Sequence, residues 1–257
     1  MRTLLAIMTV LGAASAHATV VTRDVTYEDG GVKLTGFLAY DDGNVGVPGV
    51  LIVPQWTGLT DYERGRAKQL AGLGYVAFCA DVYGGGHIAA DMKEAGTLAG
   101  KYKNDRTLFR SRLQAALAAL RRSTTVDPER CAAIGYCFGG TGVLELARSG
   151  ADVLGVVSFH GGLDSPNPAD GKNIKAKVLI LHGADDPFSS KADIAALEKE
   201  LKDGGVDYQL VFYSGAVHAF TQPMAGNDPS KGVAYNERAD KRSWIAMLDF
   251  FKEIFAR

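Results

Sequence analysis

The chain has 257 residues, 47% of them hydrophobic and 22% charged, and its formal net charge at pH 7 is -1. Such a composition excludes a disordered or fibrous chain and indicates a globular protein with room for a large core. The near-neutral charge and the lack of a basic cluster argue against nucleic acid or an anionic membrane surface as a partner.

Residues 1–18 have the order of a cleavable secretory signal. Arg2 precedes an apolar run over residues 4–11, and small residues follow as far as Ala18. The run is too short to remain as a membrane anchor, and an A-x-A site follows it instead of the turn expected after a short buried helix or strand. We therefore expect cleavage after Ala18, which removes Arg2 and changes the formal charge from -1 to -2. We also expect the mature protein to be periplasmic or secreted.

The mature chain opens with two β-rich runs and then alternates between short apolar strands and helical patterns. The first two runs, 22–27 and 32–40, flank the turn residues Asp29-Gly30-Gly31 and are expected to form an antiparallel hairpin. Further strands are expected at 50–53, 75–80, 131–136, 153–159, 178–181 and 208–213, and helices at 62–73, 106–122, 139–148, 191–202 and 236–255. This alternation predicts one α/β domain over residues 19–257 with a mostly parallel, doubly wound sheet. The glycine-rich segment 84–100 is expected to be a loop that lines the cleft.

The run Gly135-Tyr136-Cys137-Phe138-Gly139-Gly140 lies between a predicted strand and a predicted helix. A G-x-C-x-G pattern in this position is typical of a nucleophile elbow, where side chains two positions either side of the nucleophile would collide. The turn would raise the sulfur to the carboxyl edge of the sheet, and the N-terminus of the next helix would favour a thiolate. Cys137 is thus a candidate nucleophile, whereas Cys79 and Cys131 lie in apolar strands and are expected to be buried packing residues.

An acid and a histidine follow the elbow in the order that α/β-hydrolases use. The strand at 178–181 runs into Asp185 and Asp186, and the strand at 208–213 is followed by a loop with His218. Asp186 is the candidate that orients the base and Asp185 the fallback, although either could instead cap the helix that follows. His218 is the candidate base because of its place after the last strand.

No metal or other cofactor is expected. His160, His182 and His218 lack the i, i+4 spacing of a helical ligand pair, and the three cysteines lack C-x-x-C spacing. His160 and His182 lie at strand ends, so we expect each to support the site by hydrogen bonding instead of transferring the proton itself.

These motifs resemble those of the dienelactone hydrolase family of α/β-hydrolases, whose elbow carries cysteine. The resemblance covers nearly the whole mature chain and rests on the elbow and on three further segments: Asp81-Val82-Tyr83, Gly183-Ala184-Asp185-Asp186 and His218-Ala219-Phe220. It implies an α/β-hydrolase fold and a triad of Cys137, His218 and Asp186. It also implies an oxyanion hole made by the backbone amides of Trp56 and Phe138.

Two positions depart from the family pattern. Gln55 stands where the family has a glutamate tied to cysteine activation, and the stretch around Gln222 lacks the arginine that holds the substrate carboxylate. A carboxylate-bearing dienelactone would lose a bidentate partner here. Arg242 lies on a charged helical segment and is expected to be solvated. Gln55, Gln222 and His160 remain candidates for substrate binding or support.

The resulting hypothesis is a hydrolase that cleaves a small-molecule ester or lactone through a thioester acyl-enzyme. It would work without a cofactor, as a monomer or small homo-oligomer. The competing hypothesis is a catalytically silent periplasmic protein that binds a small molecule on the same fold, because Gln55 and Gln222 lack the family's charges.

Overall fold

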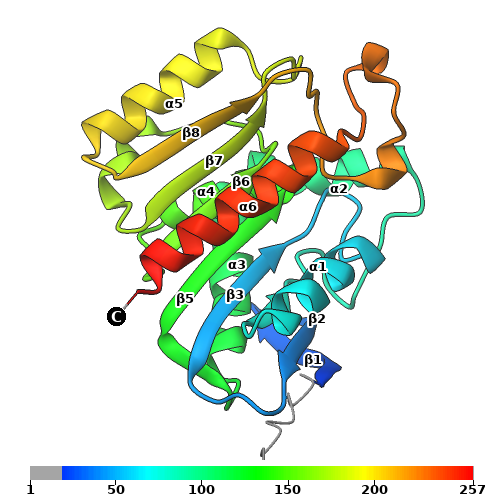
Figure 1. Cartoon of the computed structure of the whole chain (residues 1–257), viewed down its shortest axis with the longest axis vertical. Helices are drawn as coiled ribbons and strands as arrows, with labels where there is room; N and C mark the ends of the chain where they lie inside the picture. Colours follow the sequence, from blue (N-terminus) through cyan, green and yellow to red (C-terminus); the bar gives the residue numbers. More distant parts are fainter. Residues whose placement is uncertain (1–18, 257) are drawn as a thin grey trace, which may run out of the picture.

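The computed structural model describes residues 19–256, so the predicted signal segment and its cleavage site lie outside the described residues. Eight strands form one sheet in the order β1-β2-β4-β3-β5-β6-β7-β8 (Figure 1). The strands are β1 (Val20–Asp29), β2 (Val32–Asp41), β3 (Val47–Val53), β4 (Val76–Cys79), β5 (Val126–Tyr136), β6 (Gly155–Phe159), β7 (Lys177–Gly183) and β8 (Tyr208–Tyr213). The helices are α1 (Asp61–Gly72), α2 (Met92–Asn104), α3 (Arg106–Arg121), α4 (Phe138–Arg148), α5 (Lys191–Asp203) and α6 (Glu237–Ile254), with short 3-10 turns η1 (Pro168–Asn173), η2 (Pro223–Ala225) and η3 (Pro229–Lys231).

The sheet is antiparallel at its N-terminal edge and parallel elsewhere. β1 pairs with β2 from Val20 opposite Asp41 to Asp29 opposite Val32, and β2 pairs antiparallel with β4. Gly30 and Gly31 both have positive φ, 57° and 78°, as a two-residue turn of this hand requires. All pairs from β4 to β8 are parallel. The predicted α/β fold with an N-terminal hairpin is therefore confirmed.

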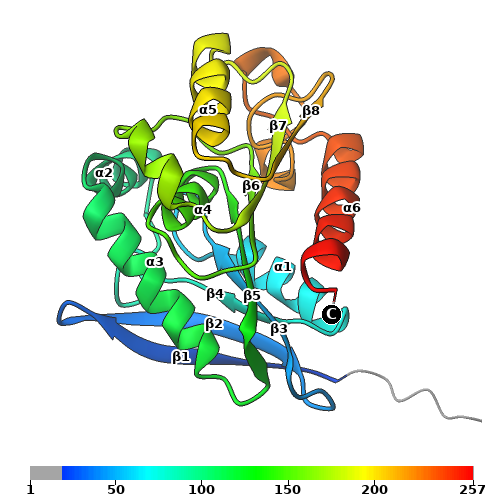
Figure 2. The same cartoon turned by 90° about the vertical axis from the view of Figure 1, so that its left-hand side faces the viewer.

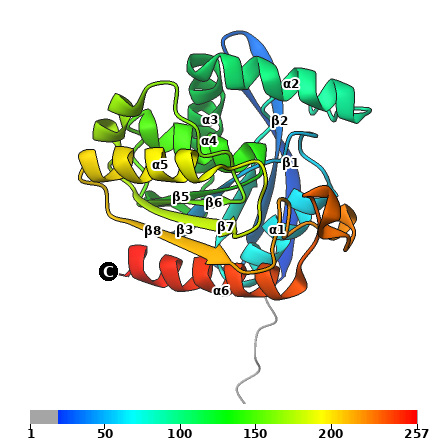
Figure 3. The ribbon, with the colours of Figure 1, turned by 90° about the horizontal axis from the view of Figure 1, so that it is seen from above.

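Helices cover both faces of the sheet and enclose two cores. Figures 2 and 3 show α1 and α6 on one face and α2, α3, α4 and α5 on the other. Because successive strand residues point to opposite faces, β3 contributes to both cores. Its Leu51 and Val53 pack into the core on the α3 and α4 side, and Val50 and Ile52 into the core beneath α1 and α6. Burial on both faces explains why the central strands are continuously apolar.

The segment 84–100 is only partly the loop that the sequence predicts, because α2 occupies its second half and continues to Asn104. Asp91 caps the helix by accepting the Glu94 N–H at 2.8 Å. On α2 only Ala95, Ala99 and Tyr102 are buried, and two of these are small. The sequence therefore shows little of the apolar periodicity that predicts a helix.

None of the helices between residues 19 and 256 combines the length and apolar character that crossing a bilayer requires.

In the parallel part of the sheet, the carboxyl ends of β3 to β8 meet at one edge, where open α/β sheets place their ligand sites. The loops after these strands carry the residues considered next.

Candidate active site

Cys137 lies in the tight turn between β5 and α4, with φ 54° and ψ -115°. Positive φ in a residue other than glycine stores about 1–3 kcal/mol of strain, which surrounding contacts must overcome. Here the Cys137 carbonyl oxygen accepts hydrogen bonds from the N–H groups of Gly140 at 2.9 Å and Thr141 at 3.2 Å, and the Cys137 N–H donates to the Phe159 carbonyl at 3.0 Å. The elbow is thus tied both to its own helix and to the neighbouring strand β6.

Glycine on either side of the elbow is a steric requirement. A Cβ on Gly135 would collide with the Gly139 carbonyl, and a Cβ on Gly139 would collide with the Val53 carbonyl. In each case the obstacle is backbone, which cannot rotate away as a side chain can. The turn can therefore be this sharp only with glycine at both positions.

Replacing Gly135 with alanine is expected to lower the free energy of unfolding by at least about 3 kcal/mol, because overpacking against rigid backbone cannot relax. Urea denaturation would measure the change. Gly65→Ala is the matched control, since a Cβ there meets nothing within 4 Å and α1 continues on both sides. That variant should gain about 0.5–1 kcal/mol. Similar stabilities for the two variants would contradict the steric account.

Asp186, His218 and Cys137 form a continuous hydrogen-bonded chain. His218 Nδ1 is 2.8 Å from Asp186 Oδ2, and His218 Nε2 is 3.1 Å from Cys137 Sγ. The second oxygen of Asp186 accepts the Phe188 N–H at 2.9 Å, which holds the carboxylate in place. The His218 loop is held by a short pairing in which its N–H donates to the Gly232 carbonyl at 3.1 Å. Three loops from distant parts of the sequence thus meet at one edge of the sheet.

The protonation states follow from these contacts. Burial alone would raise the pKa of Asp186, but the hydrogen bond and the charge of His218 outweigh it, and the pKa is lowered. Burial likewise acts to lower the pKa of His218, but the hydrogen bonds to Asp186 and Cys137 raise it to about 10. An imidazolium between a carboxylate and a sulfur is therefore the favoured resting form of the ring near neutral pH.

Of the two aspartates after β7, the structure brings Asp186 to the histidine. Asp185 is exposed, and its Oδ2 accepts the Gly215 N–H at 3.1 Å. His182 is buried behind the acid, with Nε2 3.6 Å from Asp186 Oδ2, and burial lowers its pKa. His182 therefore lies next to Asp186 without a hydrogen bond to it.

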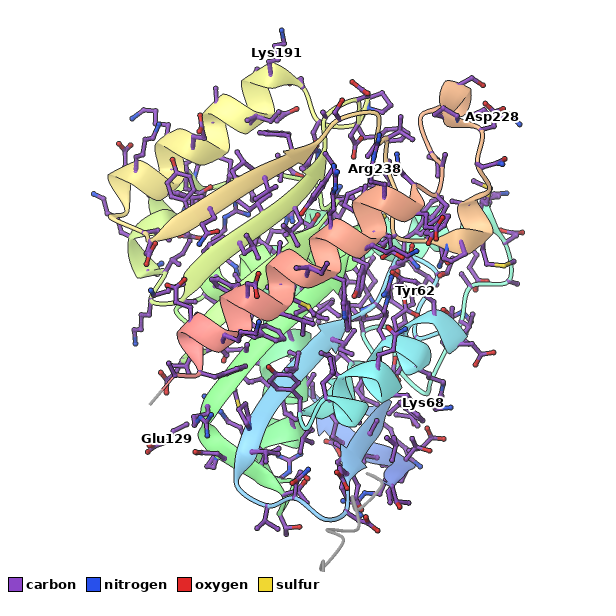
Figure 4. The ribbon with its side chains drawn as sticks, in the orientation of Figure 1. Tyr62, Lys68, Glu129, Lys191, Asp228 and Arg238 are labelled. Carbon is purple, nitrogen blue, oxygen red and sulfur yellow. The ribbon has the colours of Figure 1, made fainter. Side chains whose placement is uncertain are left out.

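His160 directly contacts the backbone of Cys137. The Cys137 N–H is shared between the Phe159 carbonyl and His160 Nδ1, which accepts it at 3.2 Å. This contact assigns the ring proton of His160 to Nε2, 2.8 Å from Thr221 Oγ1. The side chain is fully buried, and burial lowers the pKa of His160 well below its usual range, so the ring stays neutral. Thr221 Oγ1 also accepts a hydrogen bond from the Tyr62 hydroxyl at 2.8 Å. Figure 4 labels Tyr62, which lies on α1. This chain of contacts joins the elbow to the loop that carries His218.

Replacing Thr221 with valine should lower the free energy of unfolding by about 1–3 kcal/mol, because the buried His160 Nε2–H would lose its acceptor. Valine keeps nearly the same shape, so packing changes little. Thr221→Ser retains the hydroxyl and serves as the control. Equal urea midpoints for the two variants would show that the hydroxyl is not needed as an acceptor.

The two amides expected to form the oxyanion hole lie at the start of α4 and in the loop after β3. Phe138 is the first residue of α4, where N–H groups have no partner within the helix, and its ring stacks on Phe109 with centroids 4.5 Å apart. Trp56 follows β3, and its carbonyl accepts the Tyr83 hydroxyl at 2.7 Å. Its indole reaches α2, since a Cβ on Gly96 would lie 3.9 Å from the ring.

Gln55 and Gln222, which depart from the family pattern, form hydrogen bonds outside the Cys137-His218-Asp186 chain. Gln55 is buried, with Nε2 3.4 Å from Glu63 Oε1, and the half-buried Gln222 accepts the Met224 N–H at 3.4 Å as the cap of η2. Arg242 is exposed, as expected. Across residues 19–256, no three His, Cys, Asp or Glu side chains converge in a way that could hold a metal ion.

Asp81 supports the site from a buried position. In the sequence it stood out only as part of the resemblance to the family. Its carboxylate is buried and accepts backbone N–H groups from Thr35 at 2.8 Å, Tyr83 at 3.1 Å, Gly84 at 2.8 Å and Gly86 at 2.7 Å. These bonds shape the turn that presents Tyr83 to Trp56. An aspartate just before a glycine-rich turn was the available signal, because glycines leave their amides accessible.

Comparisons with known proteins agree with this architecture. The model of the dienelactone hydrolase family matches residues 34–255. A solved structure titled m3DLH is 42% identical, with a TM-score of 0.89, and the match covers 92% of this chain and 99% of that one. A dienelactone hydrolase-like promiscuous phosphotriesterase, P91, from metagenomic libraries is 40% identical with a TM-score of 0.88 over the same shares. A putative carboxymethylenebutenolidase of Aquifex aeolicus is 26% identical over 89% of this chain and 96% of that protein. The chain therefore belongs to the dienelactone hydrolase family and is a hydrolase that acts on ester or lactone bonds.

Proposed function

We propose that the protein hydrolyses a small ester or lactone through a Cys137-His218-Asp186 triad and a thioester intermediate. The observation that carries this proposal is the pair of distances at the base: 3.1 Å from His218 Nε2 to Cys137 Sγ and 2.8 Å from His218 Nδ1 to Asp186 Oδ2. Nucleophile, base and orienting acid within hydrogen-bond reach are the arrangement that covalent catalysis requires.

In acylation, His218 holds the proton of the Cys137 thiol and the sulfur attacks the ester carbonyl carbon. The carbonyl π electrons move onto oxygen, and the amides of Trp56 and Phe138 donate to the oxyanion, each contributing about 2.7–4 kcal/mol to the barrier reduction. The carbonyl re-forms, the bond to the alkoxy oxygen breaks, and His218 gives that oxygen its proton. An ester releases an alcohol here, whereas the opened lactone stays attached through its acyl carbon.

In deacylation, the same groups act on water. Once the sulfur is acylated it carries no negative charge, so one of the interactions that raise the pKa of His218 is lost. The neutral ring then takes a proton from water, hydroxide adds to the thioester carbonyl, and the C–S bond breaks. His218 retains the proton beside the departing thiolate, and the acid product leaves with the resting pair restored.

We propose neutral esters or lactones as substrates in place of carboxylate-bearing dienelactones. Gln222 supplies an amide where the family pattern has an arginine, and its side chain is used in capping η2. An amide cannot replace a bidentate guanidinium as a partner for a carboxylate. The ring of Phe188, a largely exposed side chain, packs on His218 in a T-shaped arrangement with centroids 5.3 Å apart and offers an apolar surface beside the base.

A trapped intermediate tests the proposal. The protein is mixed with p-nitrophenyl acetate, quenched in acid within the first turnover and digested, and the peptides are examined by mass spectrometry. We expect the mass of one acetyl group on Cys137 together with steady release of p-nitrophenol. Turnover with no acyl group on Cys137 would refute the thioester route. No turnover and an unreactive Cys137 would instead support the silent binding protein.

A further inference from the structure

Glu63 is a fully buried acid that the triad mechanism does not use. It lies in the first turn of α1, directly after the loop 54–60 that carries Trp56. Among residues 19–256, no lysine, arginine or histidine forms an ion pair with it. A carboxyl group buried in this way is costly unless hydrogen bonds replace its lost water. Its hydrogen-bond donors should therefore indicate what it stabilises.

Both oxygens of Glu63 accept hydrogen bonds, and they hold opposite ends of the loop. Oε2 accepts the Thr60 N–H at 2.9 Å and the Thr60 hydroxyl at 2.6 Å. Oε1 accepts the Gln55 N–H at 3.2 Å and the Gln55 side-chain amide at 3.4 Å. The Thr60 contacts form the capping box of α1, but a capping box has no need for the contacts to Gln55. The carboxyl group thus closes the loop into a ring.

The orientation of the Trp56 N–H follows from how this ring is held. That N–H shares one planar peptide unit with the Gln55 carbonyl, so fixing one group fixes the other. The Gln55 carbonyl accepts the Gly58 N–H at 3.1 Å, Glu63 holds the Gln55 N–H, and the Tyr83 hydroxyl holds the Trp56 carbonyl. Release of the Gln55 end would free the peptide unit to rotate.

We propose that Glu63 is a positioning residue for the oxyanion hole: its buried carboxyl group keeps the Gln55–Trp56 peptide unit aimed at the substrate carbonyl. The inference rests on the proposed function, because it assumes that the Trp56 amide meets an oxyanion. Glu63 itself touches neither the substrate nor Cys137. Its effect should appear only in reactions that build negative charge on a carbonyl oxygen.

The test compares two reactions of the same sulfur in Glu63→Gln. Glutamine offers one acceptor oxygen for two backbone N–H groups at opposite ends of the loop, so one end is released whichever way the amide turns. We expect kcat/KM for p-nitrophenyl acetate to fall about 10- to 100-fold, as for a misplaced catalytic group. Alkylation of Cys137 by iodoacetamide should stay within about twofold, because displacement at a saturated carbon forms no oxyanion.

The matched control is Asp193→Asn, the same acid-to-amide change in the capping box of α5, where the Asp193 carboxylate accepts hydrogen bonds from the Ser190 N–H and hydroxyl. It should leave both reactions within about twofold. If Glu63→Gln does not fold, Glu63→Asp, which is too short to reach both ends of the loop, should show the same split. Unchanged hydrolysis, or equal losses of hydrolysis and alkylation, would overturn the inference. Failure of the unmodified protein to hydrolyse the ester would refute the proposed function instead.

Discussion

Replacing Cys137 with alanine is expected to lower kcat for p-nitrophenyl acetate by at least about 10⁴-fold, as loss of a covalent nucleophile does in comparable triads. Alanine removes the sulfur that lies 3.1 Å from His218 Nε2 and that would attack the carbonyl. Binding and the oxyanion donors would remain, so a small residual rate above the uncatalysed reaction is consistent with the mechanism. Stopped-flow and steady-state release of p-nitrophenol measure the change.

The other two cysteines provide matched controls. Cys79 and Cys131 are fully buried in β4 and β5, and burial raises the pKa of both thiols. Cys79→Ala and Cys131→Ala should cost about 1 kcal/mol of stability each and keep nearly full activity. Iodoacetamide should label only Cys137 in the folded protein, because the other thiols are out of contact with solvent. Equal hydrolysis by Cys137→Ala and the unmodified protein would remove the nucleophile from the mechanism.

The meeting of Cys137, Asp186 and His218 could be predicted from sequence because each residue follows a recognisable strand. Parallel strands deliver their carboxyl ends to one edge, so the order of Cys137, Asp186 and His218 along the chain already implied that they meet. The sequence favoured Asp186 and kept Asp185 as the fallback, since both follow β7. The choice depends on backbone direction after the strand, which turns Asp185 toward Gly215 and Asp186 toward His218.

The supporting contacts were harder to predict because their partners are far apart along the chain. Tyr62 and Thr221 are separated by 159 positions, and nothing in either local sequence indicates the other. Glu63 is different, because Thr60-Asp61-Tyr62-Glu63 has the spacing of a capping box. That pattern explains two of its four contacts, and only the fold brings Gln55 to the remaining oxygen.

Replacing His218 with asparagine is expected to reduce ester hydrolysis by at least about 10³-fold and to change how alkylation of Cys137 depends on pH. With a pKa of about 10, the ring keeps its proton through the neutral range, and an imidazolium and a thiolate stabilise each other. In the unmodified protein, alkylation should therefore stay fast when the pH is lowered to 6. In His218→Asn it should rise with pH as for an ordinary thiol, whose pKa is about 8.5.

The acid partner gives this prediction its control. Asp186→Asn removes the charge that His218 faces and should shift the alkylation profile in the same direction as His218→Asn. Asp185→Asn makes the same chemical change one residue earlier, where the exposed carboxylate only accepts the Gly215 N–H, and should leave the profile unchanged. Equal shifts in the two aspartate variants would contradict the assignment of Asp186.

The comparison at pH 6 distinguishes two resting states of the Cys137-His218 pair. The ring of His218 lies 3.1 Å from Cys137 Sγ, and a positive charge at that distance favours a thiolate. If the two groups rest as an ion pair, the unmodified protein should be alkylated faster than His218→Asn at pH 6. Rates that coincide at this pH would mean that His218 takes the proton only during attack, and that the sulfur rests as a thiol.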